Sequence, residues 1–184
     1  MKTLLKTPPS LARTGSLGPL SEQVIPAMPG TNYVYSSTFT GNRPLYALLD
    51  CKANKSRALI HAGILGREVH LHFAFEDATR AKVSSIKVAK TAKLLGDVNA
   101  EFDEVFVTPA DIAIEDFYTL SARRNSKKLI EICQVACQQR KTSALVVPGM
   151  IIAVLTSGHK YGLFLAKELT PTSVSIDAYH IWAP

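Results

Sequence analysis

Short segments that are apolar, or that alternate between polar and apolar residues, occur in two blocks of this chain and constrain its fold most. Such segments, bounded by clusters of turn residues, are typical of β-strands. In the first half they are NYVYSSTF at 32–39, LYALLDC at 45–51, RALIHAG at 57–63 and EVHLHFAF at 68–75. In the second half they are ALVV at 144–147, MIIAVL at 150–155, YGLFLAK at 161–167 and SVSIDAYHIW at 173–182.

Helical signals lie between these two blocks. Asp77 is a suitable N-cap and Gly96 a suitable C-terminal stop, so we predict a helix over 77–95. After a strand at 101–108, Thr108 and Pro109 predict a second helix that runs to about Arg140, with a break near 123–126. The order of strands, helices and strands favours an α+β fold: a mostly antiparallel sheet in two meanders, with two or three helices inserted between them.

The first 30 residues differ from the rest of the chain. Half of the ten prolines lie in residues 1–30, together with several glycines and serines. Proline removes a backbone donor and breaks helices and central strands, so this segment predicts an extended arm. We therefore divide the chain into an arm at 1–30 and one α+β globular domain at 31–184.

The overall composition is that of a globular protein with a basic surface. The chain has 184 residues and a formal net charge of +6, which favours anionic partners such as nucleic acid. Its three cysteines argue against a disulfide framework and for a reducing compartment. There is no signal-peptide core, and Pro148 interrupts the longest apolar stretch before it reaches membrane-spanning length. We expect a location in the cytoplasm or within a virion.

The segment EVHLHFAFE at 68–76 carries the clearest candidate for a metal site. Alternate residues of a strand share a face, so His70, His72 and Glu76 are expected on one side. Two imidazoles and a carboxylate suit a divalent metal. The three residues also resemble a fragment of the cupin metal motif, which implies a metal-dependent enzyme. The glycines that flank the motif in cupins are not at their usual spacing here.

The same alternation has a simpler explanation. Val69, Leu71, Phe73 and Phe75 fill the opposite face, as a half-buried strand requires whatever its function. On this interpretation the histidine face is solvated and binds no metal. We favour it over metal binding.

Two groups of basic residues are candidates for binding phosphate groups. Lysines and arginines that keep a helix soluble give the same pattern, as does a face that packs against another protein. The first group, on one side of the predicted helix 77–95, is Arg80, Lys82, Lys87, Lys90 and Lys93. The second group is Arg123, Arg124, Lys127 and Lys128.

Two further pairs of residues have a structural interpretation. Cys133 and Cys137 lie one helical turn apart in an apolar stripe, so we expect them to be buried rather than to bind metal. Asp177 and His180 are three residues apart on a predicted strand, so they should face opposite sides and form no catalytic pair.

No phosphate-binding loop, nucleophile elbow, dinucleotide fingerprint or zinc-protease motif is present in the sequence. We therefore favour a non-enzymatic binding protein without a cofactor, a subunit of a homo- or hetero-oligomer held in part by the arm at 1–30. A viral or phage structural component fits this description. The alternatives are a nucleic-acid-binding protein that uses basic helical faces, and a metal-dependent enzyme that uses His70, His72 and Glu76.

Overall fold

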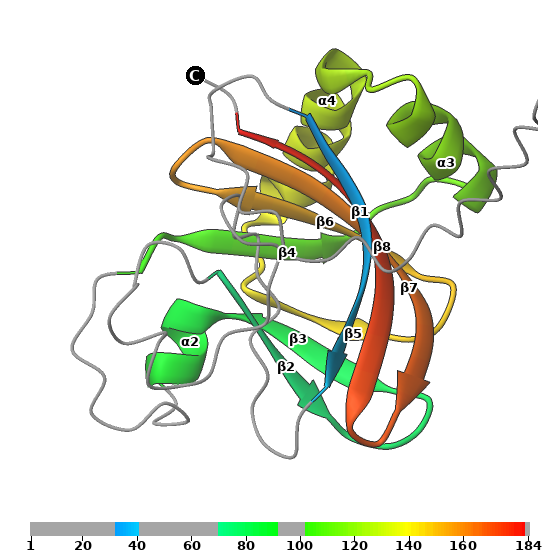
Figure 1. Cartoon of the computed structure of the whole chain (residues 1–184). Helices are drawn as coiled ribbons and strands as arrows, with labels where there is room; N and C mark the ends of the chain where they lie inside the picture. Colours follow the sequence, from blue (N-terminus) through cyan, green and yellow to red (C-terminus); the bar gives the residue numbers. More distant parts are fainter. Residues whose placement is uncertain (1–31, 41–69, 92–101, 183–184) are drawn as a thin grey trace, which may run out of the picture.

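A computed structural model describes residues 32–40, 70–91 and 102–182 (Figure 1). The predicted arm at 1–30 and the predicted strands at 45–51 and 57–63 lie outside these residues. The described strands are β1 Asn32–Thr40, β2 Leu71–Phe75, β3 Ala81–Ser85, β4 Val105–Pro109, β5 Ser143–Val146, β6 Ile151–Thr156, β7 Lys160–Thr170 and β8 Ser173–Trp182. The described helices are α2 Ile86–Thr91, α3 Ile114–Ala122, α4 Ser126–Ala136 and the short 3₁₀ helix η2 Cys137–Gln139.

All strand pairs in the described residues are antiparallel. One sheet has five strands in the order β1-β8-β7-β6-β4, and the other has three in the order β2-β3-β5. β1 pairs with β8 along its whole length, from Asn32 opposite Ile181 to Thr40 opposite Ser173. β6, β7 and β8 form a consecutive meander, so the predicted α+β fold with mostly antiparallel sheet is confirmed.

The five-stranded sheet is covered on both faces, so the described residues form three layers. Helices α3 and α4 lie over one face, and the three-stranded sheet lies toward the other (Figure 1). Along β7, Leu163 and Leu165 belong to the core beneath the helices, while Phe164 and Ala166 belong to the core shared with the three-stranded sheet. Burial on both faces explains why β6 and β7 read as continuous apolar runs rather than as alternating segments.

The predicted helix at 77–95 is wrong in its first half. Residues 76–80 form a tight turn, because the Asp77 carboxylate accepts hydrogen bonds from the backbone N–H and the hydroxyl of Thr79, each at 2.7 Å. Residues 81–85 then form β3, in which Ala81 and Val83 are buried and Lys82 is exposed. Helix begins only at Ile86, in the six-residue α2. Asp77 therefore stabilises a hairpin turn and not a helix end.

The predicted helix from Thr108 is shorter than expected and begins later. Thr108 and Pro109 end β4, at the edge of the five-stranded sheet, where a missing backbone donor is tolerated. α3 begins at Ile114. The predicted break is confirmed: Arg124 has a left-handed backbone with φ of 50°, and the Asn125 side chain caps α4 by accepting a hydrogen bond from the Lys128 N–H at 3.1 Å.

The core beneath α4 allows a test of this packing. Leu129 is completely buried in α4, whereas Val135, on the same helix, is 61% exposed. We expect Leu129→Ala to lower the free energy of unfolding by about 2–5 kcal/mol, because it leaves a cavity. The matched control Val135→Ala should change it by less than about 0.5 kcal/mol. Urea denaturation measures both, and equal effects would contradict the packing of α4 on the sheet.

Candidate functional site

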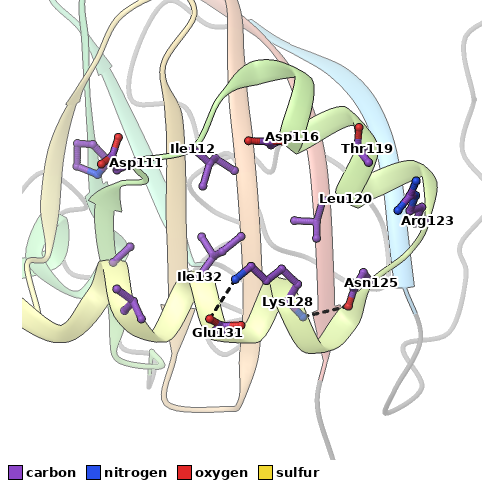
Figure 2. Close-up of a pocket in the computed structure, with 13 residues that line it drawn as sticks. Asp111, Ile112, Asp116, Thr119, Leu120, Arg123, Asn125, Lys128, Glu131 and Ile132 are labelled. Carbon is purple, nitrogen blue, oxygen red and sulfur yellow. Dashed lines mark hydrogen bonds and ion pairs between the residues drawn. The ribbon is translucent and has the colours of Figure 1, made fainter.

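A groove of about 590 Å³ lies between α3 and α4 (Figure 2). The two helices are joined by only three residues, 123–125, so they run as a hairpin on the surface of the five-stranded sheet. Ile112, Leu120 and Ile132 point into the space between the helices (Figure 2). Val135 and Ala136 continue this apolar floor toward the end of α4.

Charged side chains line the rim of the groove unevenly. Asp111 and Asp116 lie near the beginning of α3, whereas Arg123 lies at the turn between the helices (Figure 2). Lys128 and Glu131 form an ion pair with each other at 3.0 Å, so they largely neutralise one another. Within the described residues, neither Asp111 nor Asp116 has an ion-pair partner. The groove thus combines an apolar floor with an acidic end and a basic end.

The strand at 71–75 is not solvated on its histidine face. His70 and His72 are 0% and 2% exposed, so the expectation that they face solvent is wrong. Leu71 and Phe73 are buried on the opposite face, as predicted. The alternation of residues in the sequence identified the two faces correctly, but it carried no information on what covers the polar one.

His70 belongs to a polar cluster at the end of the core. The Lys160 ammonium lies 2.9 Å from His70 Nε2, and Asp103 Oδ2 lies 3.7 Å from the same ring nitrogen. Because an ammonium only donates hydrogen bonds, Nε2 of His70 accepts, which places the ring proton on Nδ1. Asp103 also lies 3.8 Å from Lys160 and balances its charge.

The turn between β6 and β7 positions this cluster. Ser157 exchanges two hydrogen bonds with Glu104, one through its backbone N–H at 2.8 Å and one through its hydroxyl at 3.1 Å. These bonds hold the adjacent Asp103 against the turn. A Cβ atom at Gly158 would lie 3.0 Å from the Asp103 carboxylate, so a glycine allows this close approach. The predicted turn at Ser157 and Gly158 is therefore confirmed and has a second role.

His180 completes the cluster from β8. Its ring stacks on Tyr33 of β1, with centroids 4.8 Å apart. Burial, together with the nearby His70 and Lys160, lowers the pKa of His180 to about 3. Burial also lowers the pKa of His72 to about 4. Both rings are therefore neutral at physiological pH, and none of these cluster residues lines the groove between α3 and α4.

Metal binding by His70, His72 and Glu76 stays a prediction. Glu76 follows the end of β2 and is exposed, whereas the two histidines are buried. In residues 32–40, 70–91 and 102–182, no group of three or more histidine, cysteine, aspartate or glutamate side chains is arranged to hold a metal ion. His70 instead belongs to an ion network with Asp103 and Lys160, and an ammonium group is a poor neighbour for a metal cation.

The first basic group does not form one helical surface. Arg80 lies in the turn before β3 and pairs with Asp77 at 3.1 Å, and Lys82 lies on β3 itself. Lys87 lies on α2 and pairs with Glu104 at 3.6 Å. The side chain of Lys90 and the whole of Lys93 lie outside the described residues. A surface that depends on one helix through 80–93 is therefore not formed as predicted.

The second basic group is brought together. Arg123 and Arg124 are exposed in the turn between α3 and α4, and Lys127 and Lys128 are exposed on the first turn of α4. Only Lys128 forms an ion pair with a described residue. The two helices joined by a short turn therefore carry three exposed cations at their connection.

Asp177 is the centre of a polar network that the sequence did not indicate. It accepts hydrogen bonds from the hydroxyls of Ser36 at 2.6 Å and Tyr118 at 2.8 Å, and it pairs with Lys167 at 3.0 Å. Burial alone would raise the pKa of Asp177, but these three partners lower it below its usual range. The network fixes α3 to β1, β7 and β8. His180 lies on the opposite face of β8, as predicted.

The two helical cysteines are buried, as predicted. Cys133 is 0% exposed, and its thiol lies 3.3 Å from the carbonyl oxygen of Gly162 on β7. Burial raises the pKa of Cys133 well above its usual range and that of Cys137 to about 11. Both thiols are therefore protonated and unreactive in the folded protein.

The lowered histidine pKa values predict acid-sensitive folding. His72 and His180 have pKa values of about 4 and 3 when folded, against 6.5 for an unperturbed histidine. The unfolded state therefore binds more protons at acidic pH. The contribution of these two histidines to the free energy of unfolding is fully present above pH 6.5 and decreases as the pH falls toward 4. Each histidine contributes a slope of about 1.4 kcal/mol per pH unit in this window.

Urea denaturation between pH 7.5 and 4 measures this slope. We expect His180→Phe, which preserves the stacking on Tyr33, to reduce the slope of the free energy of unfolding against pH by about 1.4 kcal/mol per pH unit, because one fewer proton is bound on unfolding. A wild-type stability that stays constant from pH 7 to 4 would contradict the burial of these rings as neutral groups.

Comparisons with known proteins find no relative: no family model, no curated protein and no solved structure matches the chain. Among the described residues, no helix is both long enough and apolar enough to cross a membrane.

Proposed function

We propose that this protein is a non-enzymatic binding protein that acts as a subunit of a larger protein assembly. The groove between α3 and α4 carries this proposal. It combines a solvent-accessible apolar floor with charged rims, which is the arrangement that receives an amphipathic segment of a protein. A subunit in the cytoplasm or in a virion, including a viral or phage structural component, is consistent with this role.

The helices that form the groove rest on a rigid base. Leu129 and Cys133 fix α4 to the sheet, and the network of Asp177 fixes α3. Because these contacts face the sheet, the opposite sides of both helices are left for a partner. The 61% exposure of Val135 is high for an apolar residue at the edge of such a floor. A preformed groove of this kind binds without the cost of ordering its own walls.

A substitution at the edge of the groove tests this proposal. Val135→Lys adds a charge where a partner would bury apolar surface, and lysine is favourable near the end of a helix, so folding should be retained. Light scattering should show an oligomer for the wild-type protein and at least a tenfold weaker association for the variant. The matched control Leu145→Lys changes an apolar residue that is 45% exposed on β5. Loss of assembly in both variants, or in neither, would argue against the groove.

A second candidate function is nucleic-acid binding at the turn between α3 and α4. Supporting it are the three exposed cations Arg123, Arg124 and Lys127, which lie together at the connection of two helices. Such a cluster would contact phosphates and give affinity without sequence specificity.

Salt dependence distinguishes this candidate from protein assembly. If the cluster binds duplex DNA, log Kd should change steeply with log salt, by about 0.9 for each phosphate neutralised. Arg123→Glu with Lys127→Glu should remove about two units of that slope. The control Arg80→Glu with Lys82→Glu should leave it unchanged. Absence of DNA binding at 50 mM salt would exclude this candidate.

A further inference from the structure

We propose that the α3–α4 groove binds residues 2–6 of the N-terminal arm of a second copy of this chain, so that the arm connects neighbouring subunits. This inference rests on the proposed function, because it identifies the occupant of the same groove. Three observations support it: the place where the described chain begins, the charges of the groove and of the arm, and the length of the arm.

The described chain begins beside the groove. Asn32, the first residue of β1, accepts a hydrogen bond from the hydroxyl of Ser126 at 2.9 Å and from that of Tyr179 at 2.6 Å. Ser126 is the first residue of α4, directly after Asn125, which lines the groove. The described chain therefore begins at the basic end of the groove, next to the helix hairpin that would bind the arm of another copy.

The charges and apolar residues of the arm match those of the groove. Residues 2–6 are KTLLK, in which Leu4 and Leu5 lie between Lys2 and Lys6. In an extended segment adjacent side chains face opposite sides, so one of the two leucines would contact the floor formed by Ile112, Leu120 and Ile132. The lysines suit Asp111 and Asp116, which have no ion-pair partner among the described residues. Residues 1–21 contain no acidic side chain that would be repelled there.

The length of the arm allows it to reach a neighbouring copy. α4 has 11 residues and is about 16 Å long, so five or six extended residues would span its groove. Residues 7–31 place 25 residues between the KTLLK segment and β1, and a proline-rich linker spans about 3.1 Å per residue when it is extended. Such a linker could span up to about 75 Å, which is enough to bridge two subunits, and the oligomeric state distinguishes this arrangement from binding within one chain.

Complementation between two variants of the full chain tests this inference. The arm variant Leu4→Asp/Leu5→Asp retains an intact groove, and the groove variant Val135→Lys retains an intact arm. By light scattering, each variant alone should associate at least tenfold more weakly than the wild-type chain. An equimolar mixture should form a one-to-one pair with twice the mass of one chain, because one intact arm meets one intact groove.

A charge exchange provides a second measurement. Lys2→Glu/Lys6→Glu in the arm, or Asp111→Lys/Asp116→Lys in the groove, should each weaken association by about 2- to 25-fold, since an exposed ion pair contributes a factor of about 1.5 to 5. The two sets of changes combined in one chain should restore association. Circular dichroism of every variant checks that the fold is retained.

The possible outcomes separate this inference from the proposed function. If the groove variant dissociates but the arm variant assembles normally, another segment fills the groove, and only the inference about the arm is overturned. If neither variant changes the assembly, both the inference and the proposed function fail. A wild-type chain that is monomeric, or a mixture that does not pair, also overturns binding of the arm in a second copy.

Discussion

Burial of the five-stranded sheet on both faces is the constraint on which the rest of the structure depends. Its central strands supply side chains to two cores at once, one beneath α3 and α4 and one shared with the three-stranded sheet. A polar group in these strands therefore has no solvent on either side and requires a partner within the protein. The cluster of His70, Asp103 and Lys160 meets this requirement beside the turn that joins β6 and β7. Asp177, in the middle of β8, meets it through Ser36, Tyr118 and Lys167.

The parts of the fold that depend on local chemistry could be predicted from the sequence. The continuous apolar runs of β6 and β7, and the turn at Ser157 and Gly158, were identified because neighbouring residues determine them. The strand β3 was not, because Asp77 is favourable both as a helix cap and as a turn residue, and only the antiparallel pairing with β2 decides between them. Likewise, no local signal indicates that β1 pairs with β8, which is about 140 residues away.

The candidate sites also depend on contacts between distant parts of the chain, which local sequence patterns do not reveal. The histidines at 70 and 72 were recognised as a pair on one face, but their burial depends on parts of the chain far away in the sequence. The groove was missed because its walls come from residues 109–136: the break near 123–126 was predicted, but the arrangement in space of the two helices on either side of it was not. A signal for it was present: Ile132 and Val135 extend the apolar surface of α4 beyond the stripe of Leu129 and Cys133 that packs on the sheet. Apolar residues outside the core-facing stripe indicate a second surface.

The antiparallel pairing of β1 with β8 has a mechanical consequence. Asn32 lies opposite Ile181, so the chain enters β1 and leaves β8 at the same end of the strand pair. A force that pulls the start of β1 away from the end of β8 would break the hydrogen bonds between the two strands one after another from this end. It would not load all of these hydrogen bonds together in shear. The hydrogen bonds of Asn32 with Ser126 and Tyr179 lie directly at this entry point and would take the first load. They transfer the pull to α4 and to the middle layer, which protects the pair of β1 and β8 from peeling apart.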